Sequence, residues 1–144
     1  MVDQITSSYS KTLKILNDDY SDIPITKIAS SDLEGYTQQD RGSKTLIVHL
    51  TSRNILACPF CIKNNKFIRA ATREYSEHLD VTEIYYNHLS EVKHDQVLHN
   101  YLKSKNISVS GLPVTLVLNK DGKLGKRQGV WPTIMKDFKA YLKR

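Results

Sequence analysis

The stretch ACPFCIKNNKF, residues 57–67, contains Cys58 and Cys61, the two cysteines of this 144-residue chain. Pro59 and Phe60 separate them, so both thiols fall within one turn of backbone. Three interpretations compete at this point: a redox couple, one half of a metal site, or two small residues that happen to lie in the core. The rest of the sequence has to decide among them.

Length and composition predict one domain over residues 1–144. A chain of this length with 40% hydrophobic and 25% charged residues is ordinary for a globular protein and can bury a core without disulfide cross-links. No apolar run approaches the roughly 20 residues that span a bilayer, and the N-terminus lacks the apolar segment of a secretory signal. We therefore expect no membrane span, and a location in the cytoplasm, or in the periplasm or outside the cell if a leader has been removed.

The formal net charge of +6 does not identify a partner. Lysine and arginine are scattered, with modest concentrations at residues 120–127 and 136–144, and they are not interleaved with aromatic residues in a pattern of nucleic-acid binding. We expect a solvated surface and no nucleic-acid partner; a docking face for acidic proteins is the next interpretation.

The cysteine pair is a poor structural cross-link and a poor metal site. A disulfide between Cys58 and Cys61 closes so short a loop that it stabilises the fold very little. Zinc needs four ligands, and no second CxxC and no suitably spaced histidine pair follows. We therefore expect no metal and no cofactor. The remaining histidines are expected on the surface: His78, His88, His94 and His99.

Hydrophobic periodicity alternates between strand and helix, which predicts an α/β domain with a mixed sheet. A first strand follows Pro24, and a polar segment then forms a loop or short irregular helix. Ser90 is expected to cap one helix, and Pro132 to begin the last one. The predicted strands are residues 24–29, 44–50, 80–88, 112–119 and 123–129; the predicted helices are 7–18, within an N-terminal extension 1–23, and 59–79, 90–105 and 132–144.

Cys58 falls at the junction of a predicted strand and a predicted helix. The first N–H groups of a helix lack partners and carry a partial positive charge, which favours a thiolate over a thiol. Cys61 lies one turn further on the same side, where it can attack a mixed disulfide formed on Cys58. Pro59 stiffens this turn because its ring fixes φ. Position and reactivity therefore agree with a redox pair.

These motifs resemble the thioredoxin-like superfamily of disulfide oxidoreductases. The resemblance covers roughly residues 24–144 and rests on CPFC at a strand-to-helix turn, followed by SGLPVTLVLNKDGK at residues 110–123. It implies a thioredoxin-like fold with an extra N-terminal helix, in which a cis-proline at Pro113 faces the cysteines. Leu112 would then offer its backbone to a substrate chain, with Pro59 and Phe60 completing the substrate-binding surface.

By this resemblance we expect a thiol-disulfide oxidoreductase, a monomer in which Cys58 is the nucleophile and Cys61 resolves the mixed disulfide. Its partners would be protein dithiols and disulfides, including a redox partner protein. CPFC is similar to the CPYC of glutaredoxins, but the Gly-Gly-x-Asp signature that binds glutathione does not follow Pro113. The alternative is a non-catalytic binding module with the same fold, or a protein whose CxxC handles a metal.

Two departures from the family stand out. Many members have Trp just before the first cysteine, where this chain has Ala57, and the connection TSRNILA, which includes Arg53, is longer than in thioredoxin. Thioredoxins also bury an Asp and a Lys beneath the cysteines; alignment places His49 and Glu83 there. One hypothesis makes His49 the acceptor of the Cys61 proton, held by Glu83. The other makes His49 a hydrogen-bonded core residue without a catalytic role.

Overall fold

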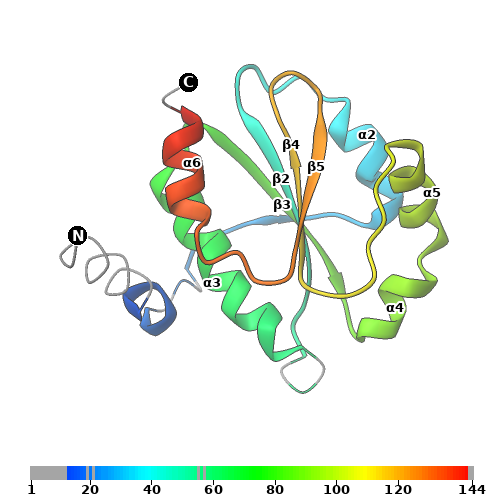
Figure 1. Ribbon diagram of the computed structural model, residues 1–144, viewed down its shortest axis with the longest axis horizontal. Helices are drawn as coiled ribbons and strands as arrows, with labels where there is room; N and C mark the ends of the chain where they lie inside the picture. Colours follow the sequence, from blue (N-terminus) through cyan, green and yellow to red (C-terminus); the bar gives the residue numbers. More distant parts are fainter. Residues whose placement is uncertain (1–12, 19, 21, 55, 57, 143–144) are drawn as a thin grey trace.

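The computed structural model describes residues 13–142 of the 144-residue chain, except residues 19, 21, 55 and 57 (Figure 1). Residues 13–17 are helical, while the rest of the predicted N-terminal helix lies outside the described residues, as does Ala57. None of the helices in the described part of the chain is both long and apolar enough to cross a membrane.

A five-stranded mixed sheet forms the centre of the domain, as the sequence predicts. Its strand order is β1-β3-β2-β4-β5. The first three strands in this order are parallel to one another. β4 pairs antiparallel with β2, and β5 pairs antiparallel with β4. The strands are β1 Thr26–Lys27, β2 Thr45–Ser52, β3 Leu79–Tyr86, β4 Val114–Leu118 and β5 Leu124–Gln128.

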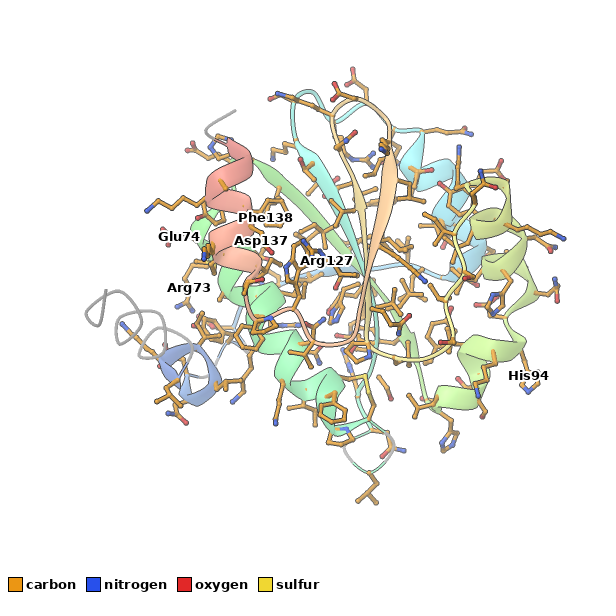
Figure 2. The ribbon with its side chains drawn as sticks, in the orientation of Figure 1. Arg73, Glu74, His94, Arg127, Asp137 and Phe138 are labelled. Atoms are coloured by element: carbon orange, nitrogen blue, oxygen red, sulfur yellow. A yellow bond between two sulfur atoms is a disulfide. The ribbon has the colours of Figure 1, made fainter. Side chains whose placement is uncertain are left out.

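Helices cover both faces of this sheet. Figure 1 shows α3 and α6 on one side and α2, α4 and α5 on the other. In Figure 2, Phe138 of α6 and Glu74 of α3 lie on the first side, while His94 of α4 lies on the far side. The helices are η1 Ser30–Asp32, α2 Leu33–Thr37, α3 Pro59–Glu74, α4 Leu89–His94, α5 Gln96–Ser104 and α6 Ile134–Leu142.

Strand alternation decides which side chains face α3. Side chains point to opposite faces of a sheet at successive positions, so residues two apart share a face. On β2, Leu46, Val48 and Leu50 belong to the core under α2, α4 and α5, whereas Ile47 belongs to the core under α3 and α6. His49 therefore shares the face of Ile47 and lies beneath α3.

Several predicted boundaries were wrong. The strand expected over 24–29 is shortened to Thr26–Lys27, and the polar segment after it forms η1 and α2. The helix expected over 59–79 ends at Glu74, because Tyr75 caps it and a turn leads directly into β3. Pro132 precedes the last helix, which begins at Ile134.

The single helix expected over 90–105 is two helices, and Asp95 separates them. Its φ of −79° and ψ of 87° are not helical, and its carboxylate accepts the backbone N–H of Leu98 at 3.1 Å, which caps α5. The other carboxylate oxygen accepts the hydroxyl of the buried Tyr86 at 2.7 Å. The expected cap, Ser90, lies inside α4, whose N-cap residue is His88.

We predict that Asp95→Ala destabilises the protein by about 2–4 kcal/mol. The substitution removes a helix cap, which costs about 1 kcal/mol, and leaves the Tyr86 hydroxyl without its partner, which costs about 1–3 kcal/mol more. Chemical denaturation measures the change. Gln96→Ala, an exposed change at the next position, is the control and should stay within about 0.5 kcal/mol of wild type. Equal stability of the two variants would contradict this role of Asp95.

Candidate active site

Cys58 and Cys61 are joined by a disulfide at the beginning of α3. Their sulfur atoms are 2.01 Å apart and their Cα atoms 5.3 Å apart. Cys58 is 2% exposed and Cys61 is fully buried. The two residues that the sequence assigns to redox chemistry are therefore brought together, and the structure holds them in the oxidised state.

The same residues determine where α3 begins. Pro59 occupies the first helical position, where its missing N–H costs no hydrogen bond. Cys58 is the N-cap residue, and its Sγ accepts the backbone N–H of Cys61 at 3.2 Å. The N–H of Cys58 in turn donates to the carbonyl of Asn54 at 2.9 Å. Sγ of Cys58 therefore lies at a helix end whose N–H groups and partial positive charge stabilise a negative charge.

Exposed apolar side chains surround the cysteine pair. Phe60 is 57% exposed with the Lys63 ammonium 5.8 Å from its ring centre, and Leu56, in the connection before Cys58, is 95% exposed.

Arg53 lies over the ring of Tyr85, with its Cζ 4.6 Å from the ring centre. The guanidinium of Arg53 is therefore directed to an aromatic ring on β3.

Leu112 and Pro113 immediately precede β4, and the peptide bond between them is cis. Pro113 is buried and its carbonyl accepts the N–H of Gly129 at 2.8 Å, whereas Leu112 is half-buried. In the β2–β4 pairing Leu50 lies opposite Val114, so Pro113 comes to the end of β2 from which the chain runs to Cys58. The β2–β4 register thus brings Leu112 and Pro113, the predicted docking segment, to the end of the sheet from which the chain enters α3.

His49 and Glu83 are in contact beneath α3, as the sequence predicts, and both are fully buried. They are paired in the β2–β3 register, and His49 Nδ1 lies 2.9 Å from Glu83 Oε2. Burial lowers the pKa of His49 and outweighs the opposing effect of Glu83. The contact between the two residues is confirmed, while a catalytic role for His49 stays a prediction.

Glu83 has two further partners that the sequence analysis missed. Arg69 of α3 donates to both carboxylate oxygens, at 2.8 and 3.3 Å, and the Tyr85 hydroxyl donates at 2.6 Å. Burial alone raises the pKa of Glu83, but the hydrogen bonds from His49, Arg69 and Tyr85 lower it to about 2. The counter-charge of the buried carboxylate is therefore Arg69, whose side chain is 15% exposed.

Asn64 is the third missed residue. It is fully buried on α3, and its Nδ2 lies 2.8 Å from His49 Nε2 and 3.4 Å from Thr115 Oγ1. Its Oδ1 accepts the backbone N–H of Trp131 at 2.8 Å. One signal in the sequence could have indicated this residue: an asparagine three positions before Phe67 lies on the same face of the helix as the apolar stripe.

The other histidines lie away from this network. His78, His88 and His94 are exposed as predicted, whereas His99 is half-buried with Nε2 2.7 Å from the carbonyl oxygen of Val92. The expectation for His99 was wrong because its ring reaches across the helix break at Asp95 to the carbonyl of Val92 and is half-buried there. Within the described residues, no group of three or more His, Cys, Asp or Glu side chains could hold a metal ion.

Comparison with solved structures identifies the fold. No protein-family model matches the chain, and no curated protein sequence is significantly similar to it. Chloroplastic thioredoxin z matches with 21% identity and a TM-score of 0.61, over 85% of this chain and 97% of its own. Mitochondrial thioredoxin 3 from Saccharomyces cerevisiae matches with 17% identity and 0.52, over 79% and 92%. The germline-specific thioredoxin Deadhead from Drosophila melanogaster matches with 15% identity and 0.54, over 83% and 99%. The chain has the thioredoxin-like fold.

We predict that Glu83 makes the stability of this protein depend on pH below about pH 5. Its pKa of about 2 in the folded state lies below the ordinary 4.5, so its contribution is complete above the unfolded-state pKa and is lost as pH falls. The stability difference between wild type and Glu83→Gln should shrink by about 3 kcal/mol between about pH 5 and pH 2. His49, kept neutral by burial, acts in the same direction.

Denaturant unfolding of wild type and Glu83→Gln across this pH range measures the difference. Glu77→Gln, which changes an exposed carboxylate, is the control and should differ from wild type by less than about 0.5 kcal/mol. A constant difference between wild type and Glu83→Gln at every pH would show that the carboxylate is not held ionised by its partners.

Proposed function

We propose that this protein is a thiol-disulfide oxidoreductase that exchanges disulfides with protein substrates through Cys58 and Cys61. The observation that carries the proposal is the Cys58–Cys61 disulfide at the N-terminus of α3, with Cys58 Sγ accepting the N–H of Cys61. A sulfur at this position is favoured as a thiolate, which is the attacking species in disulfide exchange. The thioredoxin-like fold supports the same conclusion.

The reaction proceeds in two displacements. The Cys58 thiolate attacks one sulfur of a substrate disulfide, forms a mixed disulfide and releases the other substrate sulfur as a thiolate, which takes up a proton. Cys61 then loses its proton and attacks Cys58 Sγ, which forms the Cys58–Cys61 disulfide and releases the second substrate sulfur. Two electrons pass from the dithiol to the substrate, so no cofactor is required. A redox partner protein with its own dithiol restores the reduced pair.

The substrate is a protein segment that lies across the apolar surface around Cys58. Phe60 and Pro59 are exposed beside the cysteine, and Leu112 is accessible at the segment that precedes β4. In this arrangement Leu112 and Pro113 hold the substrate backbone, while Phe60 contacts an apolar side chain next to the substrate cysteine. A monomer suffices for this reaction, because one chain supplies both sulfurs and the docking segment.

His49 is proposed as the acceptor of the proton that leaves Cys61. The cysteine is fully buried at the start of α3, and His49 is buried under the same helix. A neutral imidazole can accept a proton at one ring nitrogen and keep its hydrogen bond to Glu83 through the other. Glu83 would stabilise the imidazolium that forms.

We predict different failures for the two cysteine variants in insulin reduction driven by dithiothreitol. Cys58→Ser should reduce the rate to the uncatalysed background, because the attacking sulfur is lost. Cys61→Ser should turn over more slowly than wild type. When the reduced variant is mixed with insulin after dithiothreitol has been removed, it should accumulate a mixed disulfide between Cys58 and insulin, since the second displacement needs Cys61. Non-reducing gels and mass spectrometry identify the linkage. Wild-type turnover in either variant, or a mixed disulfide on residue 61 in Cys58→Ser, would contradict the assignment.

A further inference from the structure

The amide of Asn64 is fixed in one orientation by Trp131. A backbone N–H can only donate, so the Asn64 atom 2.8 Å from Trp131 N must be the carbonyl oxygen. Trp131 is itself held in place: its indole N–H donates to Asp137 Oδ2 at 2.6 Å and its ring lies 5.6 Å from that of Phe138. Figure 2 shows Asp137 and Phe138 together on α6, beside Arg127.

The other end of the amide must then donate. An NH₂ group has two hydrogens and no acceptor, and its nitrogen lies 2.8 Å from His49 Nε2 and 3.4 Å from Thr115 Oγ1. His49 Nε2 therefore carries no hydrogen, since a hydrogen there would point at another donor. The one hydrogen of the ring is on Nδ1, which donates to Glu83 Oε2 at 2.9 Å. His49 is neutral and in a single tautomer.

The groups around the ring permit no other arrangement. Glu83 of β3 accepts at one ring nitrogen, and Asn64 of α3 donates at the other. Arg69 supplies the positive charge that balances Glu83, so the imidazole is not required as a counter-ion. The contacts of His49 with Glu83 and with Asn64 are buried, and a buried polar group without its partner costs about 1–3 kcal/mol.

We propose that Asn64 is a positioning residue for the dithiol reaction, which imposes the Nδ1–H tautomer on His49 and so makes Nε2 its only proton-accepting atom. Asn64 follows Cys61 by three residues on the inner side of α3, so the residue that orients the imidazole moves with the helix that carries both cysteines. In the oxidised state its N–H occupies the Nε2 lone pair. Nε2 can therefore take the Cys61 proton only after this hydrogen bond opens, and Thr115 Oγ1, 3.4 Å from Asn64 Nδ2, is the acceptor to which the amide hydrogens can then turn. This effect on disulfide exchange rests on the function proposed above, whereas the tautomer does not.

The first test is the tautomer of His49 in the wild-type protein. Nuclear magnetic resonance of ¹⁵N-labelled histidine distinguishes a protonated ring nitrogen from a bare one through its couplings to the ring hydrogens. We expect His49 to show a protonated Nδ1 and a bare Nε2 between about pH 7 and pH 8, since burial lowers the pKa of its imidazole. A hydrogen on Nε2, or an imidazolium in this range, would overturn the proposal without any variant.

The second test reverses the donor. Asn64→Asp puts a carboxylate, which can only accept, between Trp131 N–H and His49 Nε2, so the ring should bind a second proton. An opposite charge this close raises the pKa of a histidine by about 1–3 pH units. Asn65→Asp is the matched control: it adds the same charge at the next position, where the side chain faces Thr51 at 2.9 Å and not His49. A neutral, unchanged His49 in folded Asn64→Asp would overturn the proposal.

The third readout is insulin reduction by the same three proteins at pH 7. An imidazolium cannot accept the Cys61 proton, so Asn64→Asp should be slower by about tenfold or more, and its pH profile should move upward with the pKa of His49. Asn65→Asp should follow the wild-type profile. Equal losses in both variants would show that charge alone acts on the cysteines and would overturn a role through His49. Absence of turnover in wild type would refute the proposed function and leave the tautomer result standing.

Discussion

The hydrogen bond from the Cys61 N–H to Cys58 Sγ is the interaction on which the account of this protein depends. It is the N-cap of α3 and also the feature that favours a thiolate at Cys58, so the boundary of the helix and the proposed reactivity of the sulfur share one cause. Pro59 at the first helical position keeps the helix from beginning earlier. The helix is anchored behind this turn by Phe67, Ile68 and Ala71, which are buried against the sheet.

A polar layer lies between this helix and the sheet, and its composition changes along the strands. Ile47 and Val81 face α3 nearer the N-terminal ends of β2 and β3, whereas His49, Glu83 and Thr115 occupy the same face nearer the cysteines. Such a layer would destabilise the core if any polar group lacked a partner. Among the described residues, every buried side-chain nitrogen and oxygen has one. A fully satisfied network of this kind holds its members in one arrangement, which a reaction centre above it requires.

The sequence could predict the features that depend on local pattern. A run of apolar and β-branched residues located β2, alternation located β3, and the spacing of Cys58 and Cys61 at a strand-to-helix junction located the candidate site. Asp95 was missed because the apolar stripe continues on both sides of it, although aspartate is a favoured N-cap residue and its carboxylate accepts the N–H of Leu98. Its second contact, with the Tyr86 hydroxyl of β3, lies outside this segment, and a pattern within the segment does not report it.

The same limit explains which site residues were found. His49 and Glu83 could be placed together because the resemblance to thioredoxins aligns them with a buried pair of that family, and the β2–β3 register puts them opposite each other. The contact of Arg69 with Glu83 required the rotation of α3 over the sheet, and that of Asn64 also required the position of the Trp131 backbone. Spacing alone indicates only that Asn64 shares the helix face of Phe67 and that Tyr85 shares the strand face of Glu83. Asparagine and arginine on a helix are also most often solvent-exposed, so their types gave no indication of burial.

The decisive measurement of thiolate stabilisation at Cys58 is the alkylation rate of each cysteine in the reduced protein, followed against pH with iodoacetamide and quantified by mass spectrometry. The account predicts that Cys58 reacts before Cys61, with a midpoint within the range of about 3.5–7.5 that helix N-termini confer on cysteine. Equal labelling of the two residues, or a Cys58 midpoint at the ordinary value of about 8.5, would contradict it.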